Sequence, residues 1–477
     1  MEVQFKNFRC FRDTGRVPIK PITLLVGENS FGKTSFMAGL NHVYGLLQDD
    51  STDLNTEPFG LGAFGDVMYR ESGKNRRKGT IEYKFYSEND DVVTWTFRNT
   101  EGDMKLDGSS IETKGKDFIG IKKENFEVRF TLERSQINLL KDLGFIVRKA
   151  QNENVHKIKL PDSFNPRLVH RLLMRRSGYN ICGSYFAISR YFESYFYNLD
   201  DDDKKNKNFF RRQLNSAIAA RNRIVHNQEP TEALWFKFTR RPRKLVHNIT
   251  RGADNIVSLA PLRNKPERAY FYGRGDLSVA DPSGENVPAK IMKLASEEKD
   301  AWSVFNETLT SFGRNAGLFE ELKVESLTSS NYPFEVNVVI GGKRISNICD
   351  VGYGVSQILP LLFEIIYSDK NTTFLIQQPE VHLHPRAQAE FGSLIVQLSK
   401  LGKKFIVETH SDFILDRLTY EISKNKFSNE DVGILFFDRL EDQSCIHPIN
   451  LGKDGTPVEV PKSYRKFFLD EVKRVWR

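Results

Sequence analysis

One stretch decides the fold of this chain: Gly27-Glu28-Asn29-Ser30-Phe31-Gly32-Lys33-Thr34, which matches the pattern G-x-x-x-x-G-K-[ST] at every fixed position. The apolar residues 22–26 precede it and predict a short buried strand, and residues 35–40 predict the start of a helix. A strand, a glycine-rich turn and a helix N-terminus in this order direct backbone N–H groups at phosphate oxygens. The stretch therefore predicts a phosphate-binding loop.

The polar side chains of this loop have expected roles toward ATP and Mg²⁺. Lys33 reaches the β- and γ-phosphates, and the Thr34 hydroxyl ligates the metal ion. A glycine turn that matches the pattern by chance is the alternative, but the strand and helix context argues against it. The rest of the predicted ATP contacts come from Asn29, Ser30, Gly32 and Ser35.

The composition is typical of a globular protein with more than one domain. A length of 477 residues exceeds one small core, so two or three domains, or one domain with an insertion, are expected. No apolar stretch is long enough to cross a membrane, and the first residues do not resemble a secretory signal. The four cysteines are far apart and form no C-x-x-C pair, which indicates a cytoplasmic protein without a zinc site. The net charge of +8 is compatible with nucleic acid or an acidic partner, although solubility is the commoner reason for such a charge.

Patterns along the chain predict a nucleotide-binding domain that is split in two. Residues 1–48 show strand, phosphate loop and helix signals, and residues 79–135 alternate polar and apolar side chains as β-strands do. Residues 163–250 have helical spacing with aromatic and basic side chains, and an α/β pattern returns after residue 256. We expect an α/β fold with a mixed central sheet flanked by helices. Its N-terminal part with a β-rich lobe spans 1–150, a mainly helical insertion spans 151–255, and its C-terminal part spans 256–477.

Three segments after the insertion carry the chemistry expected beside a phosphate loop. Residues 374–385, FLIQQPEVHLHP, form an apolar strand that runs into a polar pair and Pro-Glu. Such a strand brings one carboxylate toward Mg²⁺ and another toward the attacking water. Residues 404–411 form a second apolar strand that ends in Thr-His, where His410 can contact the γ-phosphate; a core or surface histidine is the alternative. Residues 350–357 are rich in glycine and precede a helix whose N-terminus can bind a phosphate in trans.

The phosphate loop and these segments, in this order, resemble the ABC-type ATPase heads of the SMC, recombination-mediator and OLD-nuclease group. In that family a long insertion follows the phosphate loop. A glycine-rich motif that acts in trans, a Walker B strand with a histidine-bearing D-loop, and a Thr-His switch strand come next. The resemblance covers both flanks of the chain but not the middle.

The resemblance implies a role for each matching residue. Gln377 stands at the Walker B position next to the metal ion, and Gln378 stands at the position next to the attacking water. The trans motif corresponds to Gly352, Gly354 and Ser356, the D-loop position to His384, and the switch position to His410. Ala260-Pro261-Leu262-Arg263 and Pro266-Glu267-Arg268 also resemble stretches of stand-alone bacterial members.

The chain departs from the family at the Walker B pair, where many relatives have an acidic residue. Glutamine can hydrogen-bond a water, but it cannot accept a proton or offer a charge to Mg²⁺. Glu380 and Glu408 are the nearby carboxylates that can substitute. We expect Gln378, Glu380 and His410 to form the catalytic set, with ATP bound well and hydrolysed slowly. Such a head suits a switch in which two copies share one nucleotide.

The small, stand-alone members of the group suggest what the switch controls. The chain ends soon after the switch strand and leaves no room for a Toprim nuclease domain, so we expect a separate effector. The ATPases of the PARIS and Septu anti-phage systems are the nearest comparisons. By this resemblance the protein forms a homo-oligomer of dimeric heads or a larger ring. It restrains a nuclease, of Toprim type or second of HNH type, until it meets a phage trigger protein.

Two other function classes remain open. Arg221-Asn222-Arg223-Ile224-Val225-His226 has the R-N-x-x-x-H form of HEPN ribonucleases, in which arginine stabilises a phosphorane and histidine acts as acid or base. The basic clusters 74–78 and 240–244 could bind DNA phosphates in a repair ATPase of the recombination-mediator or SMC type, or an acidic phage protein. No sustained heptad run supports the SMC type.

Overall fold

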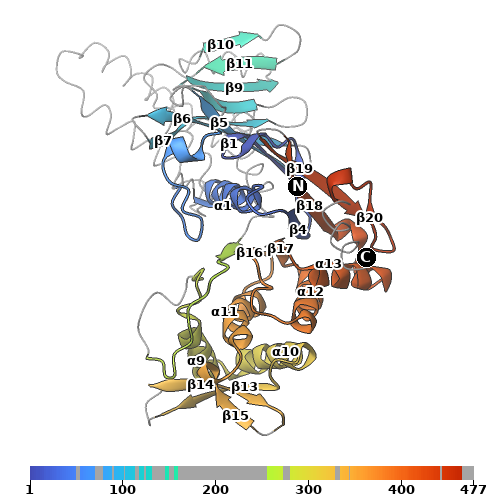
Figure 1. Cartoon of the computed structure of the whole chain (residues 1–477). Helices are drawn as coiled ribbons and strands as arrows, with labels where there is room; N and C mark the ends of the chain where they lie inside the picture. Colours follow the sequence, from blue (N-terminus) through green and yellow to red (C-terminus); the bar gives the residue numbers. More distant parts are fainter. Residues whose placement is uncertain are drawn as a thin grey trace, which may run out of the picture. The chain divides into compact units, whose positions relative to one another are not determined.

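The computed structural model (Figure 1) describes residues 1–49, 54–69, 79–88, 91–100, 103–112, 118–122, 125–131, 146–149, 155–159, 255–271, 280–327, 333–342, 344–440 and 443–464. The chain divides into two compact units. Unit 1 comprises Met1–Tyr44, Asp53–Ile81 and Ala253–Arg477, and unit 2 comprises Gly45–Thr52 and Glu82–Gly252. The predicted helical segment 163–250, with Arg221 and His226, and the basic clusters 74–78 and 240–244 lie outside the described residues.

The central sheet of unit 1 has seven strands within the described residues, in the order β12-β16-β17-β4-β18-β19-β20. The strands β12 to β18 of this order run parallel, and β18, β19 and β20 are antiparallel. Parallel strands covered on both faces are expected to be buried throughout, and every residue of β4 and β16 is buried. The bounds are β4 (Ile22–Gly27), β12 (Asn255–Leu259), β16 (Thr372–Gln377), β17 (Lys404–Glu408), β18 (Val432–Leu440), β19 (Gln443–Leu451) and β20 (Pro457–Val458).

Helices and a small sheet complete the core of unit 1. One apolar cluster joins the central sheet to the helices α9 to α13 and to the sheet β13-β14-β15, and Leu24, Phe374 and Val407 are fully buried members of it. Figure 1 shows α9 and α10 beside β13 and β14. The bounds are α1 (Lys33–Asp49), α2 (Phe64–Val67), α9 (Val287–Glu297), α10 (Lys299–Ala316), α11 (Tyr353–Tyr367), α12 (Pro385–Lys400), α13 (Asp412–Ser423), β13 (Glu321–Ser326), β14 (Phe334–Ile340) and β15 (Arg344–Asn347).

An aromatic cluster fixes the first turns of α1. The rings of Phe5 and Phe36 lie 5.5 Å apart, and those of Phe36 and Phe437 lie 5.7 Å apart. Phe5 belongs to β1 (Glu2–Phe8), which pairs antiparallel with β2 (Phe11–Asp13) and β3 (Val17–Pro18). Edge-to-face ring pairs add to the burial of apolar area, so Phe36 of the helix after the phosphate loop packs against β1 and β18.

Unit 2 contains an antiparallel sheet. Its strands follow the order β10-β11-β9-β8-β7-β6-β5, and the predicted alternation at 80–86 and 92–97 is confirmed in β5 and β6. The strand predicted at 126–132 is found as β9, which ends at Thr131. Tyr83, Trp95 and Phe97 are buried, as expected for the apolar positions of half-buried strands. The bounds are β5 (Thr80–Tyr86), β6 (Val92–Thr100), β7 (Asp103–Glu112), β8 (Phe118–Lys122), β9 (Asn125–Thr131), β10 (Ile146–Lys149) and β11 (Val155–Lys159).

The predicted fold class, an α/β protein with a mixed central sheet flanked by helices, is confirmed. The predicted domain boundaries at residues 150 and 255 stay predictions, because residues 160–254 lie outside the described part of the chain. Among the described residues, no helix is both long enough and apolar enough to span a bilayer.

Candidate nucleotide-binding site

The phosphate loop begins at Gly27, the last residue of β4, and contains three residues with positive φ, of which Gly27 has a φ of 141°. Ser30 has a φ of 67°, and Gly32 has a φ of 102°. A Cβ atom on Gly32 would lie 2.6 Å from Cys10 Sγ and 2.7 Å from Phe11 Cζ. Because both the backbone angle and the space exclude a side chain, glycine is required at this position of the loop.

The Lys33 ammonium group lies inside the loop. Its Nζ donates to the carbonyl oxygens of Gly27 at 2.9 Å and Glu28 at 2.8 Å. Burial lowers the pKa of Lys33, and the carboxylates of Glu408 and Glu380 oppose that change. The side chain is therefore a buried cation that faces two acidic groups, one at the end of β17 and one in the loop after β16.

Thr34 and Glu408 join the phosphate loop to the end of β17. The Thr34 Oγ1 atom lies 2.9 Å from Glu408 Oε2 and 3.1 Å from Oε1, so the hydroxyl donates to the carboxylate. Burial raises the pKa of Glu408, while the Thr34 hydrogen bond and the Lys33 charge lower it. Because β17 lies between β16 and β4, Glu408 is one strand nearer to the phosphate loop than the Walker B pair.

The Walker B glutamines lie at the end of β16. Gln377 is buried and pairs with Glu408 in the parallel register of β16 and β17. Gln378 has a φ of 43°, and its backbone N–H donates to the Glu408 carbonyl oxygen at 2.8 Å. A non-glycine residue in this region is strained by a small amount, which the surrounding contacts must offset. The turn after β16 is thus fastened to the end of β17.

Glu380 binds the switch strand through its side chain. Its Oε1 atom accepts a hydrogen bond from the His410 N–H at 2.7 Å. Burial raises the pKa of Glu380, and the hydrogen bonds and the Arg263 charge oppose the rise. Desolvation and the Lys33 charge lower the pKa of His410, so its neutral form is favoured. The predicted catalytic residues Glu380 and His410 are therefore in direct contact.

Arg263 is a buried cation beside Glu380 that the sequence did not mark with a role. The residue is only 6% exposed, and its Nη2 atom forms no hydrogen bond with the residues that the structure describes. Burial lowers its pKa to about 10, and the Glu380 charge opposes that change. Its backbone N–H donates to Gln357 Oε1 at 3.3 Å, and Gln357 Nε2 donates back to the Arg263 carbonyl oxygen at 3.3 Å. Arg263 therefore connects α11 with the loop that follows β16.

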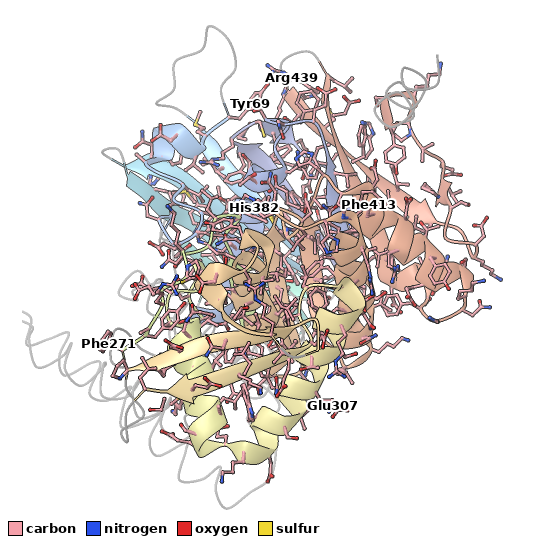
Figure 2. All side chains as sticks on the ribbon, turned by 60° about the horizontal axis from the view of Figure 1, so that its bottom comes forward. Tyr69, Phe271, Glu307, His382, Phe413 and Arg439 are labelled. Atoms are coloured by element: carbon pink, nitrogen blue, oxygen red, sulfur yellow. The ribbon has the colours of Figure 1, made fainter. Side chains whose placement is uncertain are left out.

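The glycine-rich segment starts α11 and packs against the same loop. A Cβ atom on Gly354 would lie 2.5 Å from the His382 carbonyl oxygen, so this close approach needs glycine. The ring of Tyr353 lies 4.8 Å from that of His382, the residue labelled in Figure 2, in an edge-on contact. Ser356 is buried and its hydroxyl donates to the Tyr353 carbonyl oxygen at 2.9 Å. No hydrogen bond among the described residues joins Gly354 or Ser356 to the phosphate loop, so their contact with a nucleotide in trans stays a prediction.

Two helix caps position the loops that carry the predicted histidines. His384 precedes α12, and its Nδ1 atom accepts a hydrogen bond from the Ala387 N–H at 3.4 Å. Ser411 precedes α13; its Oγ atom accepts from the Ile414 N–H at 3.2 Å. Side-chain caps satisfy N–H groups that the first helical turn leaves free. The Leu-His-Pro and Thr-His-Ser sequences thus also serve as helix starts.

The site brings together most of the residues predicted from the sequence. Lys33, Thr34, Gln378, Glu380 and His410 lie at one edge of the sheet, where the parallel strands β4, β16 and β17 end. The carboxyl ends of parallel strands are the usual place of ligand binding in open α/β sheets. The exact contacts of Asn29, Ser30 and Ser35 with a nucleotide stay predictions.

The donor set fits a magnesium–nucleotide complex. Among the described residues, no group of three or more His, Cys, Asp or Glu side chains is placed to hold a metal ion. Mg²⁺ in phosphate-loop sites does not need such a group, because phosphate oxygens and waters supply most of its ligands. A threonine hydroxyl beside one buried carboxylate, as in Thr34 and Glu408, meets this need.

Comparison with known proteins identifies the family. The AAA ATPase domain family matches residues 1–415 of the chain. The chain belongs to this family, whose members are ATPases, and the predicted class of phosphate-loop ATPase is confirmed. No curated protein matches the chain.

Solved structures of Smc heads are similar over nearly the whole chain, at low identity. The SmcHead bound to the C-winged helix domain of ScpA has 13% identity and a TM-score of 0.42, and covers 95% of this chain and 98% of its own. The Smc head domain with a coiled coil and joint from Pyrococcus yayanosii has 11% identity and a TM-score of 0.40, with 99% of each chain covered. The SMC head domain from Thermotoga maritima has 11% identity and a TM-score of 0.36, with 94% and 98% covered.

Proposed function

We propose that this ATPase works as a slow, nucleotide-dependent switch. The observation that carries the proposal is an intact phosphate loop combined with glutamine at both Walker B positions, Gln377 and Gln378. The loop residues that bind phosphates and metal are present, whereas the group that would take a proton from water is neutral. Binding therefore persists while the chemical step is slow. A long-lived ATP-bound state suits a protein that controls a partner better than one that needs rapid ATP turnover.

The bound state joins two copies of the chain. The N-terminus of α11 carries exposed Gly352 and Tyr353, and a helix N-terminus attracts a phosphate. In the proposed assembly, Lys33 of one copy and the α11 start of the other contact the same ATP. Ser356, which is turned into its own helix turn, supports that start from inside. Larger rings would be built from these dimers.

Multi-angle light scattering of the full chain tests this assembly. ATP with Mg²⁺ is expected to shift the mass to dimers or multiples of them, whereas ADP leaves it unchanged. The Lys33→Ala variant should stay in the ADP-like state with either nucleotide. An identical mass for the wild type with ATP and with ADP would contradict the proposal.

The controlled partner is proposed to be a separate nuclease in cytoplasmic defence against phage, released when a phage protein is detected. Support comes from the resemblance to the ATPases of the PARIS and Septu systems, not from a contact in the structure. Co-expression with the product of a neighbouring gene tests it. A Toprim-type nuclease that co-purifies with the wild type and not with Lys33→Ala supports the first form, and an HNH nuclease supports the second. Absence of any nuclease gene beside this one would count against both.

The two competing functions depend on residues outside the described part of the chain. For the ribonuclease, Arg221→Ala and His226→Ala should abolish RNA cleavage or toxicity, and activity that persists would remove this function. For the DNA-repair ATPase, duplex affinity should fall steeply with salt. Lack of duplex binding at low salt would remove it.

A further inference from the structure

The ends of β16 and β17 offer two oxygen donors for one metal ion. Gln377 and Glu408 are partners in the parallel register of these strands, so they end at the same level of the sheet. β17 is hydrogen-bonded to β4, and Glu408 pairs with Leu25 two residues before the phosphate loop begins. The charged group is therefore on the strand next to the loop, and the neutral group is one strand farther away.

Contact with Thr34 distinguishes the two donors. The Thr34 hydroxyl lies 2.9 Å from one oxygen of Glu408 and 3.1 Å from the other. Two adjacent oxygens in an octahedral Mg²⁺ shell, each at about 2.1 Å from the ion, lie about 3 Å apart. The hydroxyl and the carboxylate are thus already at the separation that a shared magnesium ion requires.

The surroundings of Glu408 also favour a cation. The residue is only 5% exposed, and a buried carboxylate is costly without positive charge nearby. Lys33 supplies part of that charge, but its Nζ atom is bound to the carbonyl oxygens of Gly27 and Glu28. A divalent ion beside Thr34 would offset the remaining cost.

We propose that Glu408 supplies the protein carboxylate that holds the magnesium ion of this site, together with Thr34 and in place of Gln377. The inference rests on the proposed function, since it assumes that the loop binds a magnesium nucleotide. It explains why the chain can keep metal binding without an acidic residue at the Walker B pair. Gln377 then remains a buried neutral neighbour of Glu408.

Binding of N-methylanthraniloyl-ATP to the full chain, in MgCl₂ and in EDTA, tests the assignment. Loss of a group around a protein-bound metal costs about 10- to 100-fold in metal affinity. Glu408→Gln is therefore expected to lower the stimulation of binding by magnesium about tenfold or more, with affinity in EDTA not reduced, because the variant removes a negative charge near the phosphate loop. Gln377→Leu should keep the stimulation, and Glu408→Asp should restore part of it. Glu430→Gln, an exposed carboxylate change, is the matched control.

The outcomes separate this inference from the proposed function. A wild type that does not bind the nucleotide at all overturns the proposed function and the inference with it. A wild type that binds equally in MgCl₂ and EDTA overturns the inference alone. Full stimulation in Glu408→Gln, or loss of stimulation in Gln377→Leu, also overturns it. Should Glu408→Gln fail to fold, Glu408→Ala gives the answer, since stimulation equal to the wild type without a carboxylate at this position would contradict the assignment.

Discussion

The carboxyl ends of β17 and β16 lie side by side, yet they carry different chemistry. Both strands are parallel and largely buried, and both run into a loop that precedes a helix. β17 ends in a carboxylate, Glu408, that accepts a hydrogen bond from the phosphate loop. β16 ends in two glutamines, and the nearest carboxylate, Glu380, accepts from the backbone of the switch strand instead. The two strand ends show that the negative charge of this site is carried by Glu408 and Glu380, which lie near the Walker B pair, and not by the pair itself.

The largest effect is expected from removal of Lys33, the cation that faces Glu408. Lys33→Ala is expected to lower the affinity for ATP about 100-fold. The variant loses the two charge-assisted contacts of the ammonium group with the β- and γ-phosphates, of about 1.5 kcal/mol each. Isothermal titration calorimetry measures it. Lys20→Ala is the matched control, since Lys20 lies at the other end of β4 and donates to Val432 and Asn450. Equal losses in both variants would show a general effect of charge.

The second prediction concerns Arg263, the cation that faces the loop after β16. Arg263→Met is expected to lower stability by about 2 kcal/mol, because it removes a buried cation whose charge favours the ionised form of the half-buried Glu380 carboxylate. Adding Glu380→Gln should recover part of the loss, since the charges of the two side chains interact. Scanning calorimetry of the two single variants and the double variant gives the melting temperatures. Strictly additive shifts would mean that Arg263 and Glu380 act independently.

The third prediction concerns Gln378→Glu, which places a carboxylate at the end of β16, as β17 already has. Gln378→Glu is expected to raise ATP turnover about tenfold or more, because a carboxylate can act as general base where an amide cannot. Phosphate release under saturating ATP is the measurement. Gln397→Glu, an exposed change of the same kind on α12, is the control. If slow turnover stays unchanged in Gln378→Glu, the missing carboxylate does not limit the rate.

The smallest effect is expected on stability, at the contact between the loop after β16 and α11. Gly354→Ala is expected to cost about 1 kcal/mol in stability, because its Cβ would lie 2.5 Å from the His382 carbonyl oxygen and force a backbone shift. Gly352→Ala is the matched control, since a Cβ there meets no atom within 4 Å. Thermal melts of both variants measure the difference. Equal melting temperatures would mean that the loop and the helix are not tightly packed.

Much of the site was predictable because its local signals are strong. The phosphate loop of residues 27–34 and the runs 374–377 and 404–408 are short patterns with few alternative conformations. The structure places these strands in one parallel sheet, with β17 between β16 and the phosphate-loop strand β4. Arg263 belongs to a stretch that the resemblance marked, but no role for it followed from the sequence, because nothing in the local pattern shows that its side chain is buried near Glu380. Its burial beside Glu380 depends on Gln357, which is 94 residues away in the chain.

Sequence by itself determined the chemistry available to this protein: a glycine-rich phosphate loop, a lysine and a threonine for the nucleotide, and the absence of acid at the Walker B pair. These features are properties of residue types at short spacing, so no distant contact is needed to see them. Tertiary structure decided where the negative charge acts. Thr34 and Glu408 are 374 positions apart, and only the pairing of β17 with β4 brings hydroxyl and carboxylate within hydrogen-bond distance. Sheet order is set by the burial of whole strands, and for that reason it lies beyond what any local stretch of sequence specifies.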